Sequence, residues 1–182
     1  MNFAFYVEKL TENEFFKNFK KKYKNAYCCS AFFIIDKIGN DSKQHFDFYI
    51  EGKKEMYSVK LESGGELVPV KLMDDKVLEE ISLDLDFDFN KIEKMIQDKM
   101  NKEKIKDKIQ KLLFSLQKKN NKHFLVGTIF ITGLGMIKCS IDLEELKILD
   151  FEKKSFLDIM KVKKGKKKDK TKKKIKKNKK SK

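Results

Sequence analysis

The stretch from Asn90 to Asp142 constrains the fold of this chain more than any other. Its first part carries large apolar residues at helical spacing, which predicts a long helical segment from Asn90 to Lys119. Asn90 and Glu93 have the spacing of a capping box at the start of that segment. The apolar residues fall on two faces that lie well apart around the helix, so we expect a kink or a break near Asn101. The first face holds Ile92, Ile96 and Met100, and the second holds Ile105, Ile109, Leu112, Leu113 and Leu116.

A hairpin is predicted directly after this segment. The strand from His123 to Thr132 is apolar on both faces, which is typical of a strand buried on both sides. Gly133-Leu134-Gly135 supplies the backbone freedom that a turn requires. Met136 to Asp142 then returns as a second strand, and Leu146 to Phe151 forms a third. The second half of the chain is therefore expected to contain an antiparallel meander.

The first half shows a similar order of predicted elements. Asn2 to Val7 is apolar enough for a short strand, and Thr11 with Glu14 has capping-box spacing at the start of a helix. Ala26 to Asp36 is a strand with two apolar faces. Pro69 cannot donate to a strand ladder, so the last strand of this half is predicted at a sheet edge. The alternating strands that follow Asp36 are His45–Glu51, Tyr57–Leu61 and Glu66–Leu72.

The clearest alternation in the chain runs from Ile81 to Asn90 and predicts the opening strand of the second half. Three carboxylates, those of Asp84, Asp86 and Asp88, lie on its polar face about 7 Å apart. This row of carboxylates has three interpretations: it is a metal site, a solvated face, or a surface that receives the C-terminal lysines. The predicted fold is α+β, with two strand–helix–meander halves at 1–73 and 74–160.

The second half resembles uncharacterised archaeal proteins with tandem cystatin-like or PepSY-like domains. The matching residues are Leu116-Gln117, the strand Phe124–Thr132, Met136–Asp142, Leu146–Leu149 and Ser155–Asp158. The chain departs from the family pattern at His123-Phe124, where the family has a Trp, and at Leu143-Glu144-Glu145, where it has a Gly. The resemblance implies a fold of this kind without an established activity, in a family whose relatives bind or inhibit other proteins.

The net positive charge is concentrated at one end of the chain. Fifteen of the 43 basic residues lie between Lys161 and Lys182 with a single aspartate, so this segment carries +14 of the net +15. Residues 161–182 have too few apolar residues to bury, and we expect a disordered tail. The nucleic-acid-binding residues predicted in it are Lys163, Lys164, Lys166, Lys167, Lys168, Lys170, Lys172, Lys173, Lys174, Lys176, Lys177, Lys179 and Lys180.

Lysine is a point charge without the planar fork that arginine uses on guanine, and the chain has no arginine. We therefore expect the tail to contact RNA or DNA phosphates without reading bases. A second basic surface, the lysines of the helix that begins near Thr11, could also meet phosphate or could simply be a solvated face. An anionic membrane surface is a further possible partner of the tail, without membrane insertion.

The sequence contains no recognisable set of catalytic residues. The two histidines, His45 and His123, are not placed beside a cysteine by any motif, and no phosphate-binding loop or metalloprotease motif is present. Cys28, Cys29 and Cys139 are an odd number of thiols in a chain without a recognisable export signal, so we expect buried, reduced cysteines and a cytoplasmic location. We expect no enzyme activity, no cofactor and no metal.

Two hypotheses for function follow. The first is a non-enzymatic binding or scaffold protein, whose body contacts an unidentified protein and whose lysine tail contacts RNA or DNA non-specifically. The second is a cystatin-like or PepSY-like protein-binding or inhibitory module, in which the tail is a solubilising extension.

Overall fold

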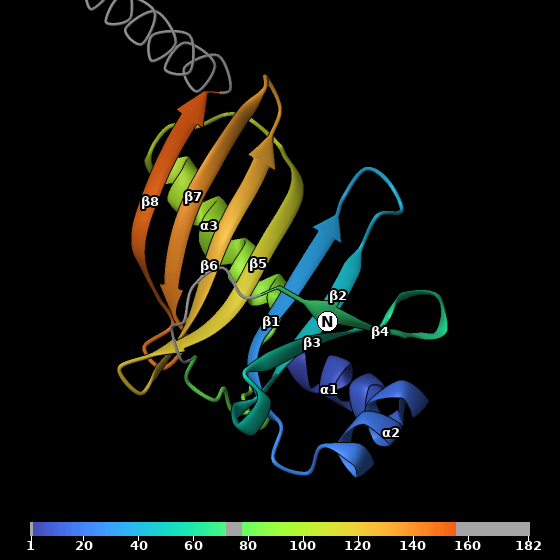
Figure 1. The fold of residues 1–182 in the computed structure, drawn as a ribbon. Helices are drawn as coiled ribbons and strands as arrows, with labels where there is room; N and C mark the ends of the chain where they lie inside the picture. Colours follow the sequence, from blue (N-terminus) through green and yellow to red (C-terminus); the bar gives the residue numbers. More distant parts are fainter. Residues whose placement is uncertain (1, 72–77, 156–182) are drawn as a thin grey trace, which may run out of the picture.

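The computed structural model describes residues 2–71 and 78–155, which form three helices and an eight-stranded sheet (Figure 1). The helices are α1 (Phe3–Glu12), α2 (Glu14–Lys22) and α3 (Phe89–Lys102). The first four strands are β1 (Tyr27–Asp36), β2 (Lys43–Ile50), β3 (Glu55–Lys60) and β4 (Glu66–Val70). The last four are β5 (Ile109–Lys119), β6 (Lys122–Ile131), β7 (Gly135–Asp142) and β8 (Lys147–Ser155). Two short 3-10 turns, η1 (Glu51–Lys53) and η2 (Glu62–Gly64), lie between β2 and β4.

The strand order in the sheet is β4-β3-β2-β1-β5-β6-β7-β8, and every neighbouring pair is antiparallel. The two meanders meet where Ala31–Asp36 of β1 pairs with Lys111–Leu116 of β5. This central pair merges them into one continuous sheet. The chain is therefore α+β, but the expected division into two strand–helix–meander halves is wrong.

The segment Asn2 to Val7 was expected as a strand and instead begins α1. The Asn2 side chain accepts a hydrogen bond from the Phe5 N–H and caps the helix. Phe3, Tyr6 and Leu10 are three and four positions apart, so a helix places them on one face, and all three are buried. The predicted cap Thr11 lies inside α1, and Asn13 caps α2 instead.

Ile81 to Phe89 was expected as the opening strand of the second half, and the structure contradicts this. The alternation does describe burial, because Ile81 and Phe87 are buried while Asp84 and Asp86 are exposed. The backbone is not part of the eight-stranded ladder. It makes single hydrogen bonds to the elements beside it, from Ile81 N–H to the Cys28 carbonyl and from Phe3 N–H to the Phe87 carbonyl.

The predicted helix from Asn90 to Lys119 is correct only in its first half. α3 ends at Lys102, close to the break expected near Asn101, and Ile109 to Lys119 forms β5. Asp88, not Asn90, caps α3 by accepting from the Asn90 and Lys91 N–H groups. β5 is a strand because β1 and β6 pair with it on both sides, which outweighs the helical preference of its leucines.

The three helices cover one face of the sheet, and the core lies between these layers (Figure 1). Ile92, Ile96 and Met100 of α3 are buried in it. Seven of the buried or packed rings form a continuous aromatic cluster, made by Phe3, Tyr6, Phe33, Phe46, Phe87, Phe89 and Phe114. None of the described helices is both long and apolar enough to cross a membrane.

The remaining predicted strands are confirmed, with ends that differ by a few residues. β4, which contains Pro69, is an edge strand, and Gly133 adopts φ +70° in the β6–β7 turn. Asn120 and Asn121, at φ 51° and 62°, form the tight turn between β5 and β6. Short-range sequence patterns therefore predict the meanders well.

Candidate functional site

The predicted nucleic-acid-binding lysines, from Lys163 to Lys180, lie outside the described residues. For these lysines, only the charge that the sequence gives therefore supports binding. In the folded part, some charged side chains are neutralised by a partner and others are not.

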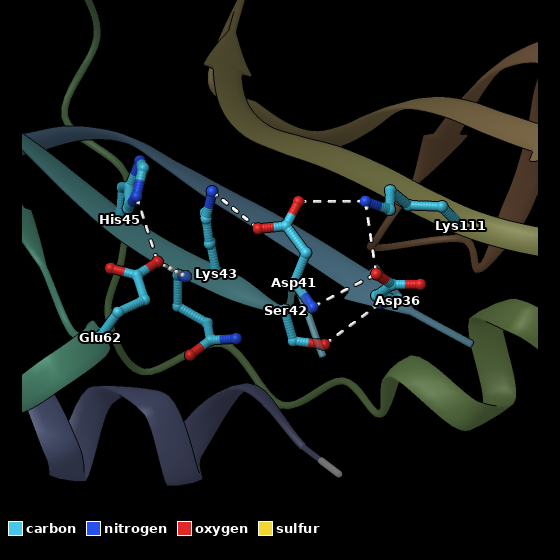
Figure 2. Close-up of polar contacts among 8 residues, drawn as sticks. Asp36, Asp41, Ser42, Lys43, His45, Glu62 and Lys111 are labelled. Atoms are coloured by element: carbon cyan, nitrogen blue, oxygen red, sulfur yellow. Dashed lines mark hydrogen bonds and ion pairs between the residues drawn. The ribbon is translucent and has the colours of Figure 1, made fainter. Parts of the chain in front are cut away.

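A network of charged side chains lies on the sheet surface at the β1–β2 turn (Figure 2). Lys111 Nζ of β5 lies 3.1 Å from Asp41 Oδ2 and 3.4 Å from Asp36 Oδ2. Lys43 Nζ lies 2.7 Å from Asp41 Oδ1. The two lysines of this network thus face two carboxylates, and the network has no surplus positive charge for an anion.

Asp36 also holds the β1–β2 turn in its conformation. Its carboxylate accepts hydrogen bonds from the N–H groups of Ile38, Gly39 and Asp41 at 3.0 to 3.2 Å. The Gly39 hydrogen bond is the main reason that the pKa of Asp36 is lowered, so the carboxylate stays ionised. The role of the network is structural.

The two histidines have different partners. His45 Nε2 lies 3.2 Å from Glu62 Oε1, which also accepts from the Gln44 N–H at 2.7 Å (Figure 2). His123 is buried, and its Nε2 accepts from the Ser82 N–H. In the described part of the chain, no hydrogen bond joins either histidine to a cysteine.

The three thiols are buried and are not paired in disulfides. Burial raises the pKa of Cys28, and it raises the pKa values of Cys29 and Cys139 to about 12. Thiols with such pKa values are not nucleophiles at neutral pH. This confirms the expectation of buried structural cysteines.

The three aspartates of the 81–88 segment have different environments. Asp84 and Asp86 are exposed, whereas Asp88 Oδ1 is held by two N–H groups at the start of α3. Over residues 2–71 and 78–155, no three side chains of the metal-binding types gather into a group that could hold an ion. The metal interpretation of this row therefore has no geometric support.

A cleft of about 450 Å³ lies between α2 and the start of the 81–88 segment. Lys20 and Lys118 line it together with Glu80 and Asp84. Lys20 Nζ already donates to the Ala26 carbonyl at 2.7 Å. The lining of the cleft therefore carries charges of both signs, and the ammonium group of Lys20 already has a backbone acceptor. These features indicate no particular class of ligand.

Five exposed lysines gather where α2 ends and β2 turns into β3. Nζ of Lys22 lies 5.1 Å from the centroid of the Tyr23 ring, and Nζ of Lys53 lies 4.9 Å from it. These contacts bring the C-terminal end of α2 and the η1 turn together. We name this surface the α2–η1 lysine cluster, and it consists of Lys21, Lys22, Lys24, Lys53 and Lys54.

The cluster carries an excess of positive charge. None of its five ammonium groups forms an ion pair with a described carboxylate. Glu51 and Glu55 flank it in sequence, which leaves more positive than negative charge. Lysines that do have carboxylate partners are Lys17, Lys37, Lys43, Lys60, Lys99, Lys111, Lys122, Lys153 and Lys154.

The sequence alone indicates only part of this cluster. The sequence predicts the lysines of α2 as a basic surface, whereas Lys53 and Lys54 lie in the connection between two predicted strands, His45–Glu51 and Tyr57–Leu61. About thirty positions separate the two groups, and the β2–β3 hairpin brings them together. Two adjacent lysines in a turn carry no local sign of such a neighbour.

The chain matches no known protein family and no curated protein. Among solved structures, it is similar to a Clostridium difficile 630 protein described as a "putative lipoprotein", with a TM-score of 0.51 and 15% sequence identity. The alignment covers 76% of this chain and 89% of that one. At this identity the similarity concerns the fold alone. The resemblance to archaeal tandem cystatin-like or PepSY-like proteins stays a prediction.

Proposed function

We propose that this protein binds nucleic acid without sequence specificity, through the lysines between Lys161 and Lys182. The observation that supports this is the separation of charge: that segment carries +14, whereas Met1 to Met160 carry +1. An array of ammonium groups releases counterions when it meets phosphates, and this release drives binding to RNA or DNA. RNA and DNA present the same phosphate chemistry to lysine.

The described part of the chain is consistent with a carrier for such a segment. Its thiols are buried, and one of its two histidines is committed to a backbone hydrogen bond in the interior. The network at Asp36 and Lys111 is internally neutralised. The folded part then serves as a support or as a surface for a protein partner, which stays a prediction.

The test is a salt series with a labelled single-stranded RNA and a duplex DNA of random sequence. Full-length protein is compared with a chain in which the lysines from Lys163 to Lys180 are glutamine, and with a chain that ends at Met160. For duplex DNA, each neutralised phosphate adds about −0.9 to the slope of log K against log salt. We expect a steep slope for the full chain and a much shallower slope for both variants.

Two results would contradict the proposal. The first is equal binding by the full chain and the glutamine variant. The second is binding of the full chain to vesicles that contain anionic lipid, together with no binding to either nucleic acid at the same salt. The second result would assign the charge to a membrane surface.

A further inference from the structure

We infer that the α2–η1 lysine cluster is a second phosphate contact for the same nucleic acid, located on the folded part of the chain. The inference deepens the proposed function and rests on it. It concerns five exposed lysines at the C-terminal end of α2 and at the η1 turn, which meet at the Tyr23 ring through Lys22 and Lys53.

The lysines of the cluster are not neutralised by carboxylates in the described part of the chain. Some lysines of the described structure are paired with a carboxylate, as Lys111 is with Asp41 and Lys153 is with Asp107. The five lysines of the cluster have no such partner among the described residues. A phosphate that approaches these lysines does not have to displace a carboxylate, so that competition does not reduce their contribution to binding.

The Tyr23 ring positions two of these ammonium groups. Both Nζ atoms lie about 5 Å from the ring centroid, within the range of a cation–π contact. The ring itself is fixed, because it stacks on Tyr57 at 6.0 Å and packs against Phe19 at 5.3 Å. Lys22 and Lys53 are therefore partly ordered before a ligand arrives, which lowers the entropic cost of binding.

The chemistry of the cluster also limits what it reads. Lysine offers no bidentate contact to a base edge, and the Tyr23 ring is already covered by Tyr57 and two ammonium groups. The ligand is therefore the phosphate backbone. The cluster adds affinity and fixes how the body lies on the nucleic acid, but it adds no sequence preference.

The test uses the full chain with Lys22→Gln and Lys53→Gln together. Loss of two phosphate contacts should make the slope of log K against log salt on duplex DNA shallower by about 1.8. The matched control carries Lys102→Gln and Lys106→Gln, which remove the same charge near the α3–β5 connection, at the other end of the molecule from α2 (Figure 1). The control should retain the slope of the unaltered chain. An equal change in both variants would overturn the inference, because net charge alone would explain it.

A second pair of variants tests the role of Tyr23 as a positioning residue. Tyr23→Phe keeps the ring beneath both ammonium groups and loses only the hydroxyl contacts with Lys22 and Lys53 that lower the pKa of Tyr23, so it should retain most of the binding. Tyr23→Leu removes the ring and should weaken binding several-fold at low salt. Thermal unfolding of both variants shows whether the fold is retained. Equal affinity of folded Tyr23→Leu and Tyr23→Phe would remove the positioning role.

The result also separates this inference from the proposed function. If the glutamine-tail variant loses affinity while Lys22→Gln/Lys53→Gln does not, the proposed function of the tail is supported and the inference about the cluster is overturned. If only the cluster variant loses affinity, the cluster is supported and the tail proposal fails. If the cluster variant loses binding to anionic vesicles but not to oligonucleotides, the cluster faces a membrane and the inference fails.

Discussion

Nε2 of His123 accepts a hydrogen bond from the backbone N–H of Ser82, with an N–N distance of 3.1 Å. The imidazole must be neutral at Nε2 to accept, and it is buried at the start of β6. This contact ties the 81–88 segment to the sheet, and its strength depends on pH.

The first prediction is a pH dependence of stability that originates at His123. Burial, followed by the charge of Lys118, lowers its pKa, while Glu144 and Glu79 oppose this. The unfolded chain therefore takes up the proton first, at about pH 6.5, and stability falls as the pH drops below that value toward the folded pKa. Urea unfolding at about pH 7 and about pH 5 should show the loss. His123→Gln should flatten the dependence.

The second prediction concerns Gly127, which faces Cys139 across the β6–β7 pair. A Cβ at Gly127 would lie 2.7 Å from Cys139 Sγ and 3.0 Å from Phe114 Cε1. Gly127→Ala should therefore lower the free energy of unfolding by about 1–3 kcal/mol. Adding Cys139→Ala should recover part of that loss, and strictly additive effects in urea unfolding would contradict the steric explanation. Gly52→Ala, where a Cβ has open space, serves as the control and should change stability by less than about 0.5 kcal/mol.

The third prediction concerns the residue that caps α3. Asp88→Ala removes the acceptor of the Asn90 and Lys91 N–H groups, so it should cost about 1 kcal/mol of unfolding free energy. Asp88→Asn keeps an acceptor and should retain most of the stability. Asn90→Ala should have little effect, because Asn90 lies inside the helix. A larger loss from Asn90→Ala than from Asp88→Ala in thermal unfolding would restore the cap predicted from sequence.

The fourth prediction concerns the thiols. Because burial raises the pKa values of Cys29 and Cys139 to about 12 and also raises that of Cys28, none is a thiolate at about pH 8 in the folded chain. Iodoacetamide should therefore leave the native protein unmodified and should add three groups in denaturant, as counted by mass. Fast alkylation of any one thiol in the native protein would place it at the surface.

Several misassigned elements show where local patterns fail. Leu112, Leu113 and Leu116 fit one face of a helix as well as they fit β5, and only the two neighbouring strands decide between them. Ile81 to Phe89 has the alternation of a strand, and the alternation correctly predicts which side chains are buried. Whether an extended segment joins a ladder depends on partners that the alternation does not contain.

The sequence by itself determined the segregation of charge to residues 161–182, the hairpins with their turn residues, and the edge position of the proline-containing strand. These features depend on residues close together in the chain, so local sterics and hydrophobic periodicity are sufficient to specify them. Only the tertiary structure decided the β1–β5 pair that makes one sheet from two meanders, and the meeting of Lys22 and Lys53 at Tyr23. Both are contacts between segments distant in sequence, and such contacts form only when the whole core packs.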